Sequence, residues 1–315
     1  MADTDRIAII GAGHIGSTAA YALMLRALFR DIVLIDNNTS LAEAEAADLA
    51  DANALARPAR VWAGDYADAA SAGIAIVTAG GATHGGETRL SVAAESAAIV
   101  SDCVDRLMGA GFHGVLVVSA NPVDLMTLVA GRRSGLPPAQ VIGTGTLLDT
   151  SRMKQALSQV LNVAAGSIEG LVLGEHGDSE VAAFSTVRIG GQTLDQFCAG
   201  GQAPQRALIA QQVRDAAYVI VKGKGYTSYG VATAIVRICE AIIRDERAVL
   251  PVSTLLTGQY GLSDLCLSLP CVLGAGGIER ILTPDLDLEE AKGLAASATV
   301  LRTAFAALFE AGVVG

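Results

Sequence analysis

A glycine-rich turn near the N-terminus has the spacing of a phosphate-binding loop. Gly11, Gly13 and Gly16 follow the apolar run at 7–10 in the pattern GxGxxG, at the expected start of a helix. These glycines permit a tight turn close to a pyrophosphate, and the helix N-terminus supplies N–H groups. Asp36 ends the next apolar run, twenty residues after Gly16, where a carboxylate can accept hydrogen bonds from an adenosine ribose and repel a 2′-phosphate. The motif therefore predicts a dinucleotide site that prefers NAD to NADP.

Polar segments further along carry side chains suited to acid–base chemistry and to binding anions. His176 lies in the segment GEHGDS at 174–179, and histidine is the side chain suited to moving a proton at neutral pH. Asp149 and Arg152 are three residues apart, so both side chains can project from one face of a helix. A single histidine is more often a solvated loop residue, however, and an acid–base pair at this spacing is usually a weak surface ion pair. The spacing alone leaves both interpretations open.

Apolar runs and helical patterns alternate through the first part of the chain. Runs rich in Val and Ile predict strands at 7–10, 32–35, 60–63, 74–78, 114–119 and 141–143, with helices between them. The helix at 40–55 is expected to begin at a capping box formed by Ser40 and Glu43. Nearly continuous apolar strands that alternate with helices predict a parallel sheet covered on both faces. Residues 1–145 are therefore expected to form a doubly wound α/β domain.

The pattern changes after about Thr144, which predicts a second domain at residues 146–315. Helices are expected at 147–161, 206–221 and 227–244, and from about Leu288 onward. Strands are expected at 170–173 and 181–187, followed by two or three short strands before the last helix. No repeat, low-complexity linker or charge block separates the halves. The mixture predicts an α+β domain that packs on the first through a broad interface.

Six segments, taken in order, closely resemble the lactate/malate dehydrogenase family. They are the dinucleotide motif, GETRL at 86–90, SANPVD at 119–124, LDTSR at 148–152, GEHGDS at 174–179 and GYTS at 225–228. The resemblance continues in LPCVLGAGGIERIL at 269–282, so it covers nearly the whole chain. It implies a Rossmann-type domain followed by a catalytic domain. The implied activity is that of an NAD-dependent oxidoreductase that interconverts an L-2-hydroxy acid and a 2-oxo acid.

The resemblance gives three of the polar residues a role in this chemistry. His176 is implied to be the acid/base that exchanges a proton with the substrate oxygen. Asp149 is implied to hold the His176 ring and, through its opposite charge, to raise the pKa of that ring. Arg152 is implied to bind the substrate carboxylate through two charge-assisted hydrogen bonds.

A second set of residues is implied to complete the substrate and cofactor sites. Arg89 would enter with a lid and polarise the substrate carbonyl. Asn121, at the end of a strand, would bind the substrate oxygen and lie against the nicotinamide. Thr227 is expected to open a helix and to contact the substrate carboxylate or the pocket wall, although an N-cap role alone is equally compatible with its place. The implied cofactor residues are Gly11, Gly13, Ile15, Gly16, Asp36, Gly80, Gly81, Ser119 and Asn121.

The chain departs from the family in the lid, six residues before Arg89. Lactate enzymes have glutamine and malate enzymes have arginine at this place, where the chain has Thr83. Threonine offers no charge to the second carboxylate of oxaloacetate, so malate activity is disfavoured. Threonine is also smaller than glutamine, which leaves room for a longer substrate side chain. Malate dehydrogenase is the alternative enzyme, with His84 as the residue that would supply a cation, and an inactive dinucleotide-binding protein is a further alternative.

A second departure from the family concerns regulation. Lactate enzymes that a sugar bisphosphate activates hold the phosphate with arginine and histidine at a subunit interface, where this chain has Lys154 and Glu169. A carboxylate at Glu169 would repel phosphate. We therefore expect no activation by fructose 1,6-bisphosphate.

Composition argues against several other classes of protein. The 315 residues include 32 acids and 22 bases, and the net charge of −10 works against binding to nucleic acid or to an anionic membrane. No apolar run reaches the length of a membrane span, and we expect no export signal at the N-terminus. Five cysteines without CxxC spacing indicate reduced thiols, and no metal site is expected. We expect a cytoplasmic enzyme that, by family resemblance, forms a homodimer or homotetramer.

Overall fold

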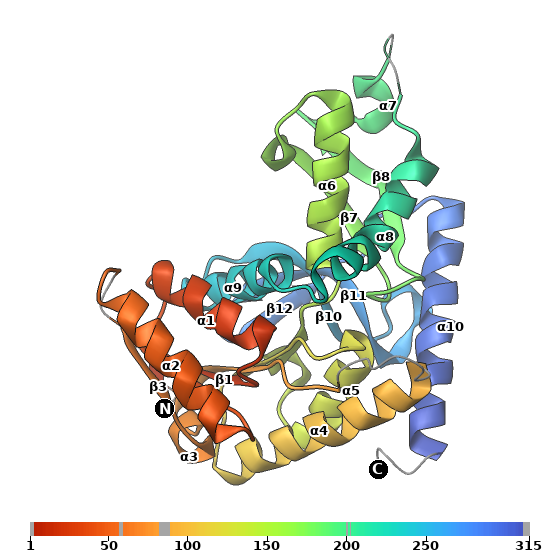
Figure 1. The fold of residues 1–315 in the computed structure, drawn as a ribbon. Coiled ribbons are helices and arrows are strands. Elements are labelled where there is room, and N and C mark those ends of the chain that lie inside the picture. Colours follow the sequence, from red (N-terminus) through yellow and green to blue (C-terminus); the bar gives the residue numbers. More distant parts are fainter. Residues whose placement is uncertain (1–2, 57–58, 82–88, 200, 202, 311–315) are drawn as a thin grey trace.

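A mixed sheet with helices on both faces forms the centre of the molecule (Figure 1). The computed structural model describes residues 3–56, 59–81, 89–199, 201 and 203–310, except for the side chains of residues 3–4 and 89–91. Within these residues the sheet has nine strands. They are β1 (Asp3–Ile10), β2 (Asp31–Ile35), β3 (Arg60–Ala63), β4 (Ala72–Val77), β5 (Val115–Val118), β6 (Val141–Gly143), β10 (Ala248–Thr257), β11 (Ser263–Gly274) and β12 (Gly277–Ile281).

Six of these strands run parallel in the order β3-β2-β1-β4-β5-β6. Along β1, alternate residues face opposite sides of the sheet, as the pleat requires. Ile7 and Ile9 belong to the core beneath α1 (His14–Leu25) and α2 (Thr39–Asn53). Ala8 and Ile10 belong to the core beneath α4 (Arg89–Gly109) and α5 (Val123–Ser134), with the short α3 (Tyr66–Ala69) nearby. The predicted doubly wound, Rossmann-type sheet is thereby confirmed.

The start of α2 differs from the prediction. The helix begins at Thr39, and the side chain of Asn38 caps it by accepting a hydrogen bond from the backbone N–H of Leu41 at 3.2 Å. The predicted capping box at Ser40 and Glu43 is therefore wrong. Asparagine is as strong an N-cap as serine, so the spacing of Ser40 and Glu43 was a misleading signal.

Three strands of the second half extend the sheet beyond β6. β10 pairs antiparallel with β6 through Ser253 and Gly143, and β11 and β12 follow as antiparallel neighbours. The prediction of short strands here is wrong for β10 and β11, which have 10 and 12 residues. A Cβ atom on Gly143 would lie 2.2 Å from the hydroxyl of Thr127, so only glycine permits this close packing. One sheet therefore contains strands from both halves of the chain.

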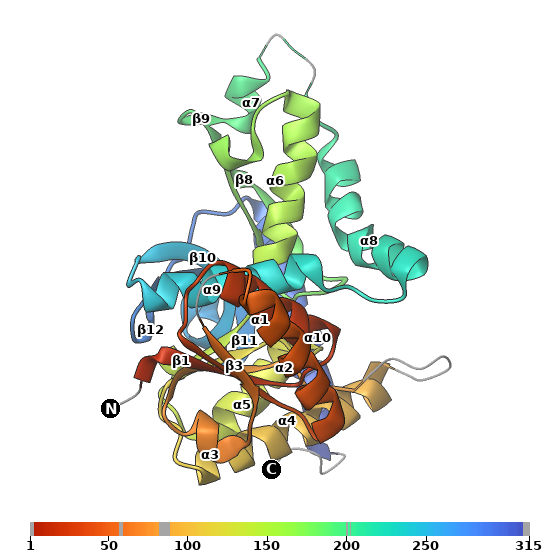
Figure 2. The ribbon, with the colours of Figure 1, turned by 60° about the vertical axis from the view of Figure 1, so that its left-hand side comes forward.

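A smaller sheet and its helices project to one side of the large sheet (Figures 1 and 2). Its apolar core lies between the small sheet and the helices α6 and α8, and includes Met153, Leu157, Val172 and Val187. The elements are α6 (Leu147–Leu161), β7 (Ile168–Leu173), β8 (Val181–Ile189), β9 (Gln192–Thr193), α7 (Leu194–Phe197) and α8 (Arg206–Lys224).

Two long helices and three short 3-10 helices complete the described part of the chain. α9 (Tyr229–Ile243) packs beside α1 over the large sheet, and α10 (Leu288–Glu310) crosses the opposite face near α4 and α5 (Figure 1). The 3-10 helices are Pro138–Gln140, Ala165–Ser167 and Gln259–Gly261. Among the described helices, none is long and apolar enough to cross a membrane.

Candidate active site

The glycine turn between β1 and α1 is fixed by close backbone packing. Gly11 has a φ of +104°, and a Cβ atom there would lie 2.7 Å from the backbone nitrogen of Ala79. A Cβ atom on Gly16 would lie 1.9 Å from the carbonyl oxygen of Gly11. Around Gly13, in contrast, no described residue outside its immediate chain neighbours has an atom within 4 Å of the place of a Cβ, which leaves this side of its backbone open to a ligand. The turn thus has the tight packing and the open face that binding of a pyrophosphate requires.

Asp36 lies beside this turn at the end of β2. Its two carboxylate oxygens accept hydrogen bonds from the backbone N–H groups of Ala12, at 2.7 Å, and Asn38, at 2.9 Å. The carboxylate therefore braces the turn in addition to facing the place expected for a ribose. An apolar side chain at this position would lose both hydrogen bonds.

A cavity of about 490 Å³ opens at the carboxyl ends of β1, β2 and β4. This is the edge of a doubly wound sheet at which ligands bind, and the volume suits part of a dinucleotide. Of the predicted cofactor residues, Gly11, Gly13, Asp36 and Gly80 line this cavity. Ile15, Gly16, Gly81, Ser119 and Asn121 are not part of its lining. Lining residues that the sequence analysis missed include Tyr66, Thr78, Ile99, Asp102 and Arg106.

Ser119, at the end of β5, has a polar atom that fits a bound group. Its hydroxyl is buried and has no hydrogen-bond partner among the described residues. A buried hydroxyl without a partner is costly unless another molecule supplies one. Together with the open turn at Gly13, this observation shows that the residues present are compatible with a dinucleotide.

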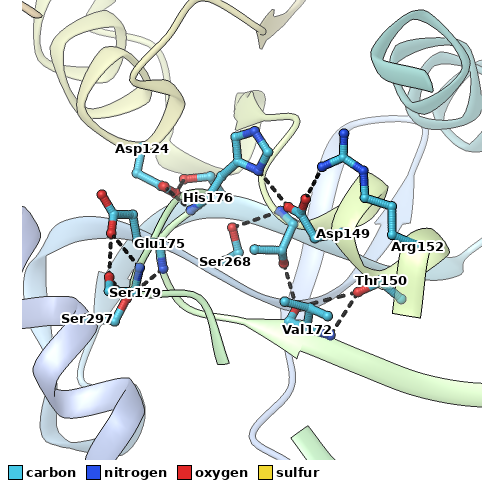
Figure 3. A network of polar contacts seen from close by, with 12 residues as sticks. Asp124, Asp149, Thr150, Arg152, Val172, Glu175, His176, Ser179, Ser268 and Ser297 are labelled. Carbon is cyan, nitrogen blue, oxygen red and sulfur yellow. Dashed lines mark hydrogen bonds and ion pairs between the residues drawn. The ribbon is translucent and has the colours of Figure 1, made fainter. Parts of the chain in front are cut away.

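His176 and Asp149 form a close pair at the junction of the two sheets (Figure 3). His176 lies in the loop after β7, and Asp149 lies in the first turn of α6. The Nδ1 atom of His176 is 2.5 Å from a carboxylate oxygen of Asp149, whose side chain is only 2% exposed. An ionised carboxylate can only accept, so Nδ1 carries the hydrogen and donates it. The other ring nitrogen, Nε2, does not take part in this contact, and an imidazole nitrogen is chemically suited to exchange a proton.

Arg152 completes this cluster from the same helix. Its guanidinium donates a hydrogen bond of 2.8 Å to the second carboxylate oxygen of Asp149, so Asp149 bridges the arginine and the histidine. The i, i+3 spacing thus places both side chains on one face of α6, as predicted. Because Asp149 is buried, the ion pair of Arg152 and Asp149 is not a weak surface pair. The guanidinium has further N–H donors that can bind an anion.

The charges around His176 keep it protonated at neutral pH. Burial by itself would lower the pKa of His176, but the carboxylate of Asp149, with smaller contributions from Asp124 and Glu180, raises that pKa to about 9. Burial would also raise the pKa of Asp149, yet His176 and Arg152 together hold it below its usual value. At neutral pH the site therefore contains an imidazolium beside a carboxylate, and the imidazolium can donate a proton.

We expect the imidazolium of His176 to lose its proton near pH 9, well above the ordinary value of about 6.5. Because the folded pKa is the higher one, this group stabilises the fold fully below about pH 6.5, and the contribution is lost as the pH rises through 9. Replacing Asp149 by Asn should move the titration midpoint downward, since the charge that holds the proton is removed. Heteronuclear NMR of the four histidines measures the midpoint.

An exposed aspartate provides the control for this titration. Asp195 lies in α7 and pairs with Arg206, so Asp195→Asn should leave the His176 midpoint unchanged. A midpoint that stays near pH 9 in Asp149→Asn would contradict the assigned cause.

The loop that carries His176 is held at three consecutive backbone N–H groups, those of residues 174–176. Figure 3 shows the contacts of Glu175 with Ser297 and of His176 with Asp124. Each N–H donates to a different element, so the loop is fixed from three sides. The acceptors are the carbonyl of Ser268 in β11 at 3.1 Å, the hydroxyl of Ser297 in α10 at 2.7 Å and the carboxylate of Asp124 in α5 at 2.7 Å.

Asp124 is a structural residue of the site that the sequence analysis missed. One carboxylate oxygen accepts from the backbone of His176, and the other accepts from the hydroxyl of Ser253 in β10 at 2.6 Å. Burial raises the pKa of Asp124 to about 6, although these two hydrogen bonds oppose the rise. Asp124 therefore joins the Rossmann-type half to the histidine loop.

The structure says less about the remaining predicted substrate residues. Asn121 is exposed in the loop between β5 and α5. The prediction that Thr227 opens or caps a helix is wrong, because α9 begins at Tyr229 and Ser228 occupies the N-cap position. The backbone of Arg89 begins α4, but its side chain lies outside the described part of the structure, as do Thr83 and the rest of the predicted lid at 82–88.

Comparisons with known proteins agree with this geometry. Residues 5–143 match the lactate/malate dehydrogenase NAD binding domain, and residues 146–311 match the alpha/beta C-terminal domain of that family. The chain is 43% identical over 307 residues to L-lactate dehydrogenase of Thermus aquaticus, which covers 96% of this chain and 99% of the relative. It is 41% identical over 301 residues to L-lactate dehydrogenase of Acetivibrio thermocellus, and this match covers 94% of this chain and 95% of the relative.

A solved structure shows the same likeness in three dimensions. The crystal structure of minor L-lactate dehydrogenase from Enterococcus mundtii matches with a TM-score of 0.94 at 36% identity, over 96% of this chain and 98% of that chain. The matches cover both halves, including the NAD-binding half and the half that contributes Asp149, Arg152 and His176. The chain therefore belongs to the lactate/malate dehydrogenase family, as an oxidoreductase that acts on 2-hydroxy acids with NAD as its cofactor.

Proposed function

We propose that the protein is an L-lactate dehydrogenase whose pocket also accepts 2-oxo acids with longer side chains than pyruvate. The observation that carries the proposal is the buried carboxylate of Asp149, which joins His176 to Arg152. The relatives at 41% and 43% identity are named L-lactate dehydrogenases, which supports both the substrate and its stereochemistry. Uncharged Thr83 supports a substrate that has a single carboxylate.

The proposed mechanism assigns a separate task to each charged group. Arg152 binds the substrate carboxylate through its planar guanidinium, which is already oriented by Asp149. This places the 2-oxo group near Nε2 of His176, which donates a proton to the oxygen as the carbonyl is reduced. NADH, when bound, supplies the hydride to the carbonyl carbon. The C=O group gains one hydride and one proton and becomes CH–OH, and His176 is left neutral, with the hydrogen on Nδ1 still donated to Asp149.

Four further residues are proposed to complete the substrate site. Arg89 is proposed to polarise the carbonyl oxygen. Asn121 is proposed to bind the substrate oxygen beside the nicotinamide, and Thr227 to contact the carboxylate or the pocket wall. Thr83 is proposed to face the substrate side chain. The remaining cofactor contacts are assigned to the glycine turn, Ile15, Asp36, Gly80, Gly81 and Ser119.

A panel of 2-oxo acids assayed with NADH tests the substrate. We expect pyruvate to be reduced with at least tenfold higher kcat/KM than oxaloacetate, because a second carboxylate at Thr83 would be desolvated without a partner. We also expect 2-oxobutyrate and 2-oxoisocaproate to remain substrates, since a pocket distinguishes chains by only about 1–3 kcal/mol per methylene. A tenfold preference for oxaloacetate would favour malate dehydrogenase, and turnover of none of these acids would favour an inactive dinucleotide-binding protein.

We further propose that fructose 1,6-bisphosphate does not activate the enzyme. Burial lowers the pKa of Lys154, while the nearby carboxylate of Glu169 partly opposes that shift. The lysine that would meet a phosphate is thus already beside an acid of this chain, which supports the proposal.

The assembly and setting of the protein are also proposals. We propose a cytoplasmic homodimer or homotetramer, with residues 1–145 as the NAD-binding domain and 146–315 as the catalytic domain. Large apolar side chains exposed on α8 at 218–221 support the presence of a subunit interface.

A further inference from the structure

Glu180 is a buried carboxyl group that the proposed mechanism does not use. It lies four residues after His176, immediately before β8, and is only 7% exposed. Its Oε1 atom is buried and has no hydrogen-bond partner among the described residues. An ionised carboxylate in such a place is costly, so the environment favours the uncharged acid.

Four charged groups on three elements face Glu180. Asp149 and Arg152 belong to α6, His176 to the loop before Glu180, and Arg214 to α8. Burial and the carboxylate of Asp149 raise the pKa of Glu180, and the three cationic groups oppose them, with a result of about 8. Near neutral pH the uncharged form of Glu180 therefore predominates, and the four described groups that face it carry one negative charge, on Asp149, and three positive charges.

We propose that Glu180 is a positioning residue that acts through Arg152 and sets how strongly Arg152 holds the substrate carboxylate, according to whether the Glu180 carboxyl is charged. This inference rests on the proposed function at Arg152. The uncharged acid leaves the positive charge of Arg152 to the substrate. The ionised acid places a second negative charge beside the guanidinium, which then attracts the substrate carboxylate less strongly.

Assays of L-lactate oxidation distinguish the effect of Glu180 on substrate binding from that of His176. Lactate binds to the neutral imidazole, which accepts the hydroxyl proton, so loss of the His176 proton improves lactate binding as the pH rises. Ionisation of Glu180 acts in the opposite direction. The contribution of His176 is common to the parent and to Glu180→Gln. At saturating NAD we therefore expect the ratio of the KM for L-lactate in the parent to that in Glu180→Gln to rise about tenfold between about pH 7 and pH 9.5, the size of effect that one nearby charge produces.

Glu180→Gln is the reference because its amide cannot ionise, so the pH dependence of its KM contains the contribution of His176 without that of Glu180. Asp178→Asn is the matched control, since it removes an exposed carboxylate of the same loop, and its KM should follow that of the parent across this range. A ratio of the KM of the parent to that of Glu180→Gln that stays constant within about twofold across this range would overturn the proposal.

Infrared difference spectra of the parent and Glu180→Gln, without substrate, give a second readout. We expect the carbonyl stretch of a protonated carboxyl group at pH 7, and its loss by about pH 9. Absence of this band together with normal turnover would overturn the Glu180 proposal and leave the proposed function intact. Turnover of no 2-hydroxy acid, even with the band present, would refute the proposed function and the role of Glu180 at Arg152 with it.

Discussion

Replacing His176 by Asn is expected to lower kcat/KM for pyruvate reduction by about 10²–10⁴-fold, the contribution typical of a positioned acid/base. Asparagine can still donate a hydrogen bond to the oxygen, but it has no proton to release to it. The affinity for NADH should remain within about twofold, because the glycine turn and Asp36 lie on other elements. Steady-state kinetics and a fluorescence titration with NADH measure the two quantities.

His113 offers the matched control for this change. It is an exposed histidine before β5, and its Nδ1 atom lies 3.2 Å from the carbonyl oxygen of Gly111. His113→Asn should keep the kcat/KM of the parent within about twofold. If His176→Asn retained turnover within about tenfold of the parent, the acid/base role of His176 would be refuted.

Replacing Arg152 by Lys is expected to lower kcat/KM for pyruvate by about 10- to 100-fold, mainly through KM. This range corresponds to the roughly 1.5–3 kcal/mol of a hydrogen bond to a charged group. Lysine keeps the positive charge but lacks the planar fork that binds a carboxylate with two parallel hydrogen bonds. Asp149 is buried and would keep His176 and the ammonium as partners, so the fold should survive. Kinetics and thermal unfolding together test both statements.

Arg244 provides the same substitution on the surface. Its side chain is 55% exposed, and its guanidinium pairs with Glu240 one helical turn away, at 2.6 Å. Such pairs contribute at most about 1 kcal/mol, so Arg244→Lys should leave the KM for pyruvate unchanged. Arg152→Lys with a KM equal to that of Arg244→Lys would show that Arg152 does not bind the substrate carboxylate.

Local patterns predicted the parallel sheet and the glycine turn, because their cause lies in a few neighbouring residues. The strands at 60–63 and 141–143 and the helix at 147–161 have the predicted bounds. The spacing of Asp149 and Arg152 placed both on one helix face for the same reason. Their assembly with His176 was expected from family resemblance alone, since nothing local brings residue 176 to residue 149.

The missed features depend on contacts between distant segments. Asp124 reads as one polar residue at the start of a helix, and only the fold brings it to His176 and Ser253. The sequence places Glu180 in a loop, and only the fold buries it and brings it near charged groups of α6 and α8. The pairing of β10 with β6 joins residues more than a hundred positions apart, which no periodicity encodes. The cap at Asn38 was missed because a competing spacing pointed to Ser40.

The pairing of β10 with β6 limits how the protein can be taken apart. A fragment that ends near residue 145 would keep the cofactor turn, yet β6 would lose its neighbour and present an unpaired edge to solvent. The same cut would remove Ser253 from Asp124. A chimaera that exchanges the cofactor half with that of a relative must therefore also match the edge of β6 and the side chain of Asp124 to its new partner. Neither half can therefore be replaced by that of a relative without changes at these contacts.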